Sequence, residues 1–196
     1  MPILKIIIKQ LMKYCKKPFF IIRLILILVV TLNNLYLQGQ VIPSREYQLK
    51  AVFLFNFTQF VDWPPASYDT EQSPLVIGIL GKNPFGTYLE QTVSGEKING
   101  HPVIVRYFEN EAEAKGCHLL FLNIPESKKR NDILKALKGK SILTVSDGID
   151  FLEQGGMIRF FTNKNKIKIQ INLEASKASE LVVSSKLLGV AEIFKP

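Results

Sequence analysis

Residues 75–86 read LVIGILGKNPFG, a short apolar run followed by a loop of glycine, lysine, asparagine and proline. An apolar run of this length without alternation predicts a strand that is buried on both faces, as in a parallel sheet. In the loop, Asn83 is expected to cap a helix with Pro84 in its first turn, running to about Val93. A buried strand that passes directly into a helix indicates an α/β fold.

The alternation of strand and helix continues along the middle of the chain. Further strands are predicted at residues 103–108 (VIVRYF), 118–124 (HLLFLNI) and 141–146 (SILTVS), with an amphipathic helix at residues 126–137. Elements in this order predict a mostly parallel central sheet flanked by helices.

The last third of the chain has a different pattern. MIRFFT at residues 157–162 and IKIQINL at residues 167–173 flank the polar turn NKNK, which predicts a C-terminal antiparallel hairpin. In the second segment isoleucine alternates with lysine and glutamine, so one face of this strand is expected to be buried and the other exposed to solvent. Short helices are predicted near residues 175–181 and 185–192. Residues 40–196 as a whole are long enough for a single α/β domain with its own core.

A helix dense in aromatic residues precedes the first strand. Ser44 is the expected N-cap of a helix at residues 45–61, whose apolar side chains cover about two-thirds of its circumference. Such a helix is expected to be largely enclosed, with Lys50 reaching outward to solvent. Trp63 lies beyond the helix, before two prolines, and is the aromatic residue expected to make an external contact. The other aromatic residues of the stretch are predicted to be core: Phe53, Phe55, Phe57 and Phe60.

Residues 1–39 carry most of the net charge of the chain. They contain six lysine and arginine residues and no acid, whereas the rest has 19 basic and 17 acidic residues, so no nucleic-acid partner is expected. A lysine-rich start followed by the apolar run at residues 24–32 predicts a signal peptide cleaved after about Gly39. The alternative is an uncleaved inner-membrane anchor, although residues 19–32 are short against the roughly 20 residues of a full span. Both interpretations predict export.

The exported part shows no assembled catalytic set, and it is expected to be neither an enzyme nor a cofactor or metal binder. His101 and His118 lack partners at metal-ligand spacing. Cys117, the only cysteine outside the leader, is expected to be a small buried residue, with pairing between molecules as the alternative. Asp147 and Asp150 are a candidate acid/base pair, but their glycine-containing setting favours a turn. A hydrolase that uses Cys117 or these aspartates is the least favoured hypothesis.

Five segments in order resemble the YfiR family of exported proteins, which includes HmsC-like members. They are EYQLKAVFLFNFTQFVDWP, GKNPFG, CHLLFLN, ILTVSD and the tail GGMIRFF…KIKIQINLEASKASELVVSSKLLGVAEIF, which together span nearly all of residues 46–194. The resemblance implies a periplasmic α/β regulator, often dimeric, that binds the periplasmic part of an inner-membrane diguanylate cyclase. Such binding restrains cyclic-di-GMP synthesis and hence biofilm formation. Relatives are also linked to sensor kinases.

The expected function is therefore a non-enzymatic exported regulator that occupies the periplasmic domain of a membrane signalling protein. The alternative is a periplasmic small-molecule sensor acting with a sensor kinase, with its pocket beside the aromatic helix at the carboxyl ends of the strands. Gly155 and Gly156 precede the hairpin and indicate a bulge or a close approach. Aromatic and arginine anchors dominate interfaces. The contact candidates are Trp63, Glu153, Met157, Arg159 and Phe160.

Overall fold

The computed structural model describes Arg23 and residues 43–195. The predicted signal peptide and its cleavage point after Gly39 lie outside the described residues. Within the described part, no helix has both the length and the apolar character that crossing a bilayer requires.

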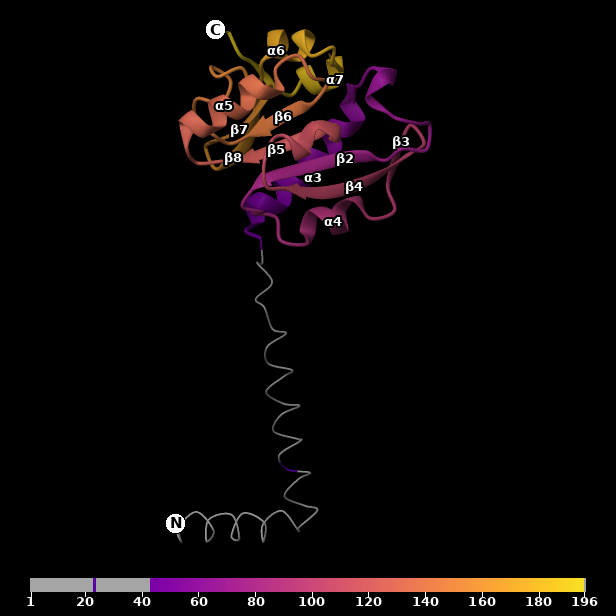
Figure 1. Ribbon diagram of the computed structural model, residues 1–196. Helices are drawn as coiled ribbons and strands as arrows, with labels where there is room; N and C mark the ends of the chain where they lie inside the picture. Colours follow the sequence, from indigo (N-terminus) through magenta and orange to yellow (C-terminus); the bar gives the residue numbers. More distant parts are fainter. Residues whose placement is uncertain (1–22, 24–42, 196) are drawn as a thin grey trace, which may run out of the picture. The chain divides into compact units, whose positions relative to one another are not determined.

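Residues 43–195 form one large mixed sheet and one small sheet (Figure 1). In the large sheet the five central strands are parallel, β8 runs antiparallel to β7, and β3 runs antiparallel to β4. This arrangement confirms the predicted mostly parallel sheet and C-terminal hairpin. From edge to edge the strands are β10 (Glu192–Ile193), β8 (Lys166–Ile171), β7 (Ile158–Asn163), β6 (Leu143–Ser146), β5 (Leu119–Asn123), β2 (Leu75–Gly81), β4 (His101–Phe108) and β3 (Lys97–Ile98).

Helices cover the two faces of the sheet, and each face has its own core. One core joins the sheet to α3, α4 and α7, and the other joins it to α5 and the turn η2. Leu75, Ile77 and Ile79 of β2 enter the first core, whereas Val76 and Leu80 enter the second, as expected for a doubly buried strand. The helices are α3 (Arg45–Phe60), α4 (Tyr88–Val93), α5 (Ser127–Leu137), α6 (Leu173–Ala178) and α7 (Ser185–Leu188), with 3-10 turns η1 (Pro65–Ser67) and η2 (Glu113–Gly116).

The order of the strands places a topological switch at β2. The chain passes from β2 to β4 on one side and then returns to β5 on the other. In open α/β sheets a crevice forms at the carboxyl ends of the strands at such a point. Here the N-terminal part of α3 lies at that edge, where Lys50 and Tyr47 bind Asp147, which directly follows β6.

The exposure of two side chains on α3 differs from the sequence prediction. Lys50, expected to reach solvent, is only 3% exposed, whereas Leu49, one of the apolar side chains of the helix expected to be enclosed, is 48% exposed. The cause is the ion pair that turns the Lys50 ammonium inward, with its Nζ 2.9 Å from the Asp147 carboxylate and 2.7 Å from that of Glu46. Thr58, another polar residue on this helix, is buried because its hydroxyl donates to the Phe55 carbonyl at 2.6 Å.

The loop after β2 also corrects a prediction. Asn83 does not cap a helix that contains Pro84, because its Oδ1 accepts from the Phe85 amide at 2.9 Å and closes a turn. The helix starts only at Tyr88. The side chain of Phe85 is fully buried and meets the rings of Tyr47 and Phe121, so the loop is anchored in the core.

Four two-residue strands are absent from the sequence prediction, and one of them, β3, pairs with the start of β4. β1 (Val61–Asp62) pairs antiparallel with β9 (Val182–Val183) and forms the small sheet. The last predicted helix, at residues 185–192, ends at Leu188, and residues 192–193 instead join β8 as the parallel strand β10. The pairing of β1 with β9 ties the end of α3 to the C-terminal region and fixes the start of the segment that carries Trp63.

Candidate functional site

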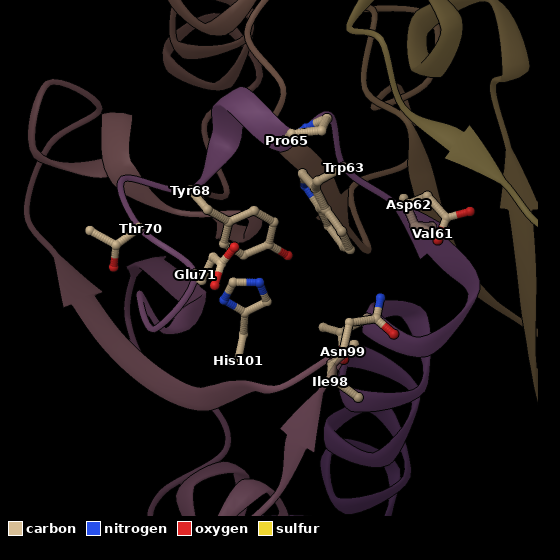
Figure 2. Close-up of a pocket in the computed structure, with 11 residues that line it drawn as sticks. Val61, Asp62, Trp63, Pro65, Tyr68, Thr70, Glu71, Ile98, Asn99 and His101 are labelled. Atoms are coloured by element: carbon tan, nitrogen blue, oxygen red, sulfur yellow. The ribbon is translucent and has the colours of Figure 1, made fainter.

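An open cavity of about 400 Å³ lies beside the C-terminal end of α3 (Figure 2). It lies near the amino ends of the strands, since His101 begins β4 and His118 directly precedes β5. The sequence predicted a pocket at the carboxyl ends instead, the edge at which Lys50 pairs with Asp147. The lining residues are Thr58, Val61, Asp62, Trp63, Pro65, Tyr68, Thr70, Glu71, Ile98, Asn99 and His101.

Trp63 forms one wall of this cavity. Its indole Nε1 donates to the His118 carbonyl at 3.0 Å, and its ring meets the His118 ring edge-on, with centroids 6.0 Å apart. The side chain is partly buried and packs against the core around α3. In Figure 2 the rest of the indole points into the cavity. Trp63 is therefore fixed in orientation and still accessible from the cavity.

Tyr68 lies between two histidine rings. Its ring stacks on His101 with centroids 3.9 Å apart and lies 4.4 Å from the His118 ring. His101 Nδ1 donates to the Ser73 carbonyl at 2.6 Å, because a carbonyl can only accept. Burial, followed by the charge of Asp62, raises the pKa of the Tyr68 hydroxyl, which therefore stays protonated.

A tight hairpin turn brings β3 and β4 to the cavity. Asn99 and Gly100 both have left-handed backbone angles, with φ of 52° and 90°, as a two-residue turn of the Asn-Gly type requires. The turn pairs Ile98 with His101 across the hairpin. As a result, Ile98, Asn99 and His101 all line the cavity.

The formally charged side chains of the cavity are acidic. Asp62 and Glu71 lie on its exposed rim, and none of the described residues that line it is a lysine or an arginine. The cavity therefore combines aromatic walls with a local excess of negative charge.

His118 beneath these rings is a buried neutral imidazole. Burial, and then the neighbouring His101, lower the pKa of His118 to about 4. Its Nδ1 accepts from the Val76 amide at 3.1 Å, which places the proton of the neutral ring on Nε2.

This buried histidine makes stability depend on pH. Its folded pKa of about 4 lies below the unfolded value of 6.5, so the unfolded state binds more protons between these limits. Stability is therefore expected to fall by about 2 kcal/mol as the pH falls from 6.5 to 4, allowing for solvent screening. In His118→Asn, Oδ1 replaces Nδ1 as acceptor without titrating. Denaturant unfolding at both pH values should show a weaker pH dependence in the variant, and an unchanged dependence would contradict the assignment.

The other contact candidates lie away from Trp63. Met157 and Phe160 are 4% and 1% exposed, and their expected exposure is corrected, because both enter the core around α3. Phe160 stacks on Phe57 with ring centroids 5.7 Å apart. Glu153 is exposed and, with one side of Met157, lines a second cavity of about 830 Å³ between α5 and α6.

Arg159 lies on the opposite face of β7 from Phe160 and is partly buried. Its guanidinium lies over the Phe161 ring at 5.7 Å. Gln170 lies opposite Arg159 on β8, and Lys168 lies opposite Phe161 on the same face. Ile169 between them is buried, so the predicted alternation of β8 is confirmed. The structure thus brings Glu153 and Met157 to one cavity and separates them from Trp63.

The glycine pair before β7 meets two separate requirements of the backbone, a left-handed turn and a close approach. Gly155 has a left-handed backbone with φ of 92°, and a side chain on Gly156 would overlap the buried Phe151 ring. The close approach is internal to the fold, so the pair shapes the core beneath the loop.

The residues considered for catalysis are tied into structural contacts. Cys117 is buried, and burial raises the pKa of its thiol to about 12, which confirms its interpretation as a small core residue. Asp147 binds Lys50, whereas Asp150 binds Arg130, so the two carboxylates belong to separate ion pairs. Among the described residues, no cluster of three or more histidine, cysteine or acidic side chains is arranged for a metal ion.

The fold and the site define an α/β domain with a mostly parallel sheet and an aromatic, acidic cavity at its amino edge. The sequence model of the YfiR/HmsC-like family matches residues 47–192, which is most of the chain. The chain therefore belongs to the YfiR/HmsC-like family, a family of regulatory proteins. The search of curated proteins finds no match to it.

Sequence reasoning found Trp63 but missed its partners in the cavity. Tyr68 and Glu71 come from the loop before β2, whereas Asn99 comes from the turn between β3 and β4. Neither segment has a periodic pattern. The Asn99-Gly100 pair was the one available signal, because this dipeptide is typical of a two-residue hairpin.

Proposed function

We propose that this protein is an exported regulator that binds the periplasmic part of an inner-membrane signalling protein and restrains it. The observation that carries the proposal is membership of the YfiR/HmsC-like family over residues 47–192. The partner class is a diguanylate cyclase, so the output is cyclic-di-GMP synthesis and biofilm formation. The cyclic nucleotide forms in the cytosol and need not touch the protein.

The proposed contact residues are those that the fold leaves accessible. Trp63 is open to the first cavity, Glu153 is exposed beside the second, and Arg159 lies on the partly covered face of β7. Arginine and tryptophan are enriched among residues that dominate interface energies. A homodimer, which the family resemblance implies, is part of the proposal.

Affinity capture from detergent-solubilised host membranes tests the proposal. We expect the tagged protein to recover a membrane signalling protein with a periplasmic domain. Arg159→Ala should reduce this recovery at least tenfold, as expected for a residue contributing more than about 1.4 kcal/mol to binding. Lys177→Ala, at an exposed position in α6, is the matched control for the loss of one positive charge. Equal recovery with both variants would contradict the contact role of Arg159.

The cavity favours a second candidate function, a small-molecule sensor acting with a sensor kinase. Its volume of about 400 Å³ lies within the usual range for small-molecule sites. A ligand that binds only the native state raises the melting temperature, so thermal shift measurements detect this function without any partner.

A further inference from the structure

We propose that the cavity around Trp63 binds a small organic cation, of the alkylammonium class. The proposal rests on the second candidate function, the small-molecule sensor, and does not depend on the identity of a membrane partner. Its basis is the combination of aromatic walls, an acidic rim and the absence of lysine and arginine among the described lining residues.

The charge of the cavity selects the sign of the ligand. Asp62 and Glu71 place two carboxylates on the rim, and no described lining residue contributes an ammonium or guanidinium group to neutralise them. The negative charge of Asp62 acts on groups inside the cavity, because it contributes, after burial, to raising the pKa of the Tyr68 hydroxyl. An anionic ligand would be repelled, and a cation would be attracted.

The aromatic walls select an organic cation over a bare metal ion. Tryptophan is the side chain whose ring face attracts a cation most strongly. The hydrogen bond from Nε1 to the His118 carbonyl holds the indole in one orientation, so little ordering is needed when a ligand binds. Hard metal ions instead require several converging oxygen ligands.

The stacking of the other rings limits how the ligand is held. Both faces of Tyr68 are covered, one by His101 and one by His118, which leaves its hydroxyl end directed into the cavity (Figure 2). The amide of Asn99 enters from the opposite side. A flat aromatic ligand therefore lacks a second ring face for stacking, whereas a compact ammonium with a polar group can use the indole face and these polar groups.

Fluorescence titration of the purified exported protein tests the proposal, because Trp63 is the only tryptophan in the chain. The probes are choline and putrescine, which separate quaternary from primary ammonium ligands. The matched neutral probe is 3,3-dimethylbutan-1-ol, which has the shape of choline without its charge. We expect a saturable change in emission with at least one cation, with a Kd between about 1 μM and 1 mM, and none with the alcohol.

Charge variants show whether the response comes from the cavity. Asp62→Asn and Glu71→Gln should each weaken binding at least threefold, whereas Glu109→Gln, an exposed acid outside the cavity, should bind as the unaltered protein does. Far-UV circular dichroism confirms that each variant is folded. The proposal is overturned if neither cation gives a saturable change up to about 10 mM, if the neutral alcohol binds equally well, or if Glu109→Gln weakens binding as much as the cavity variants. None of these outcomes bears on membrane capture.

Discussion

Phe160→Ala is expected to lower the free energy of unfolding by about 3–5 kcal/mol, the usual cost of removing a buried phenylalanine. Phe160 is 1% exposed, with ring centroids 5.7 Å from Phe57 and 5.9 Å from Phe53 of α3. It also lies opposite Ile169 across the hairpin. Truncation therefore opens a cavity where α3 meets β7. Equilibrium unfolding in urea measures the loss.

Phe161→Ala is the matched control for this substitution. Phe161 is the next residue of β7, points to the other face and is only partly buried. We expect its truncation to cost about 1 kcal/mol, as for most partly exposed positions. If Phe160→Ala left stability unchanged and abolished partner binding, Phe160 would be the contact residue that the sequence suggested, and its place in the core would be wrong.

Asp147→Ala is expected to destabilise the protein by about 3 kcal/mol, because it removes a partner from a buried ammonium group. The Asp147 carboxylate accepts from the Lys50 ammonium at 2.9 Å and from the Tyr47 hydroxyl at 3.0 Å. Lys50 also lies over the Tyr47 ring, with Nζ 4.5 Å from the centroid. After the substitution, the exposed Glu46 is the remaining anion in contact with Lys50.

Lys50→Met tests the same network from the other side. Methionine fills a similar volume without a charge, and a buried ion replaced by an apolar residue often leaves stability unchanged. The Asp147 side chain is 28% exposed and keeps the Tyr47 hydroxyl, so we expect a change of about 1 kcal/mol or less. A loss as large as that of Asp147→Ala would contradict this account of the network.

The sequence predicted the elements with strong patterns and missed those without them. The apolar run of β2 and the alternation of β8 were enough to place both strands. β1, β9 and β10 have two residues each, which is too short for any period, and they exist only because tertiary contacts pair them. Lys50 was misplaced because its partner, Asp147, lies far away in the sequence and the pattern of α3 contains no trace of it.

The candidate site shows the same division. Trp63 was predicted to be a contact residue because the single tryptophan of the chain, followed by two prolines, is conspicuous in the local sequence. Its neighbours Tyr68 and His101 meet only after β4 has paired with β2. Met157 and Phe160 were expected to be exposed but are buried, since the segment after the two glycines has no local sign of which face the core will cover.

Membrane capture is the measurement that tests the proposed regulatory role most directly. The tagged protein and its Arg159→Ala and Lys177→Ala variants would be compared in one experiment, with mass spectrometry of the recovered proteins. We predict that the unaltered protein and Lys177→Ala recover the same membrane signalling protein, a diguanylate cyclase, and that Arg159→Ala recovers at least tenfold less. Recovery of no membrane signalling protein by the folded, unaltered protein would contradict the proposal.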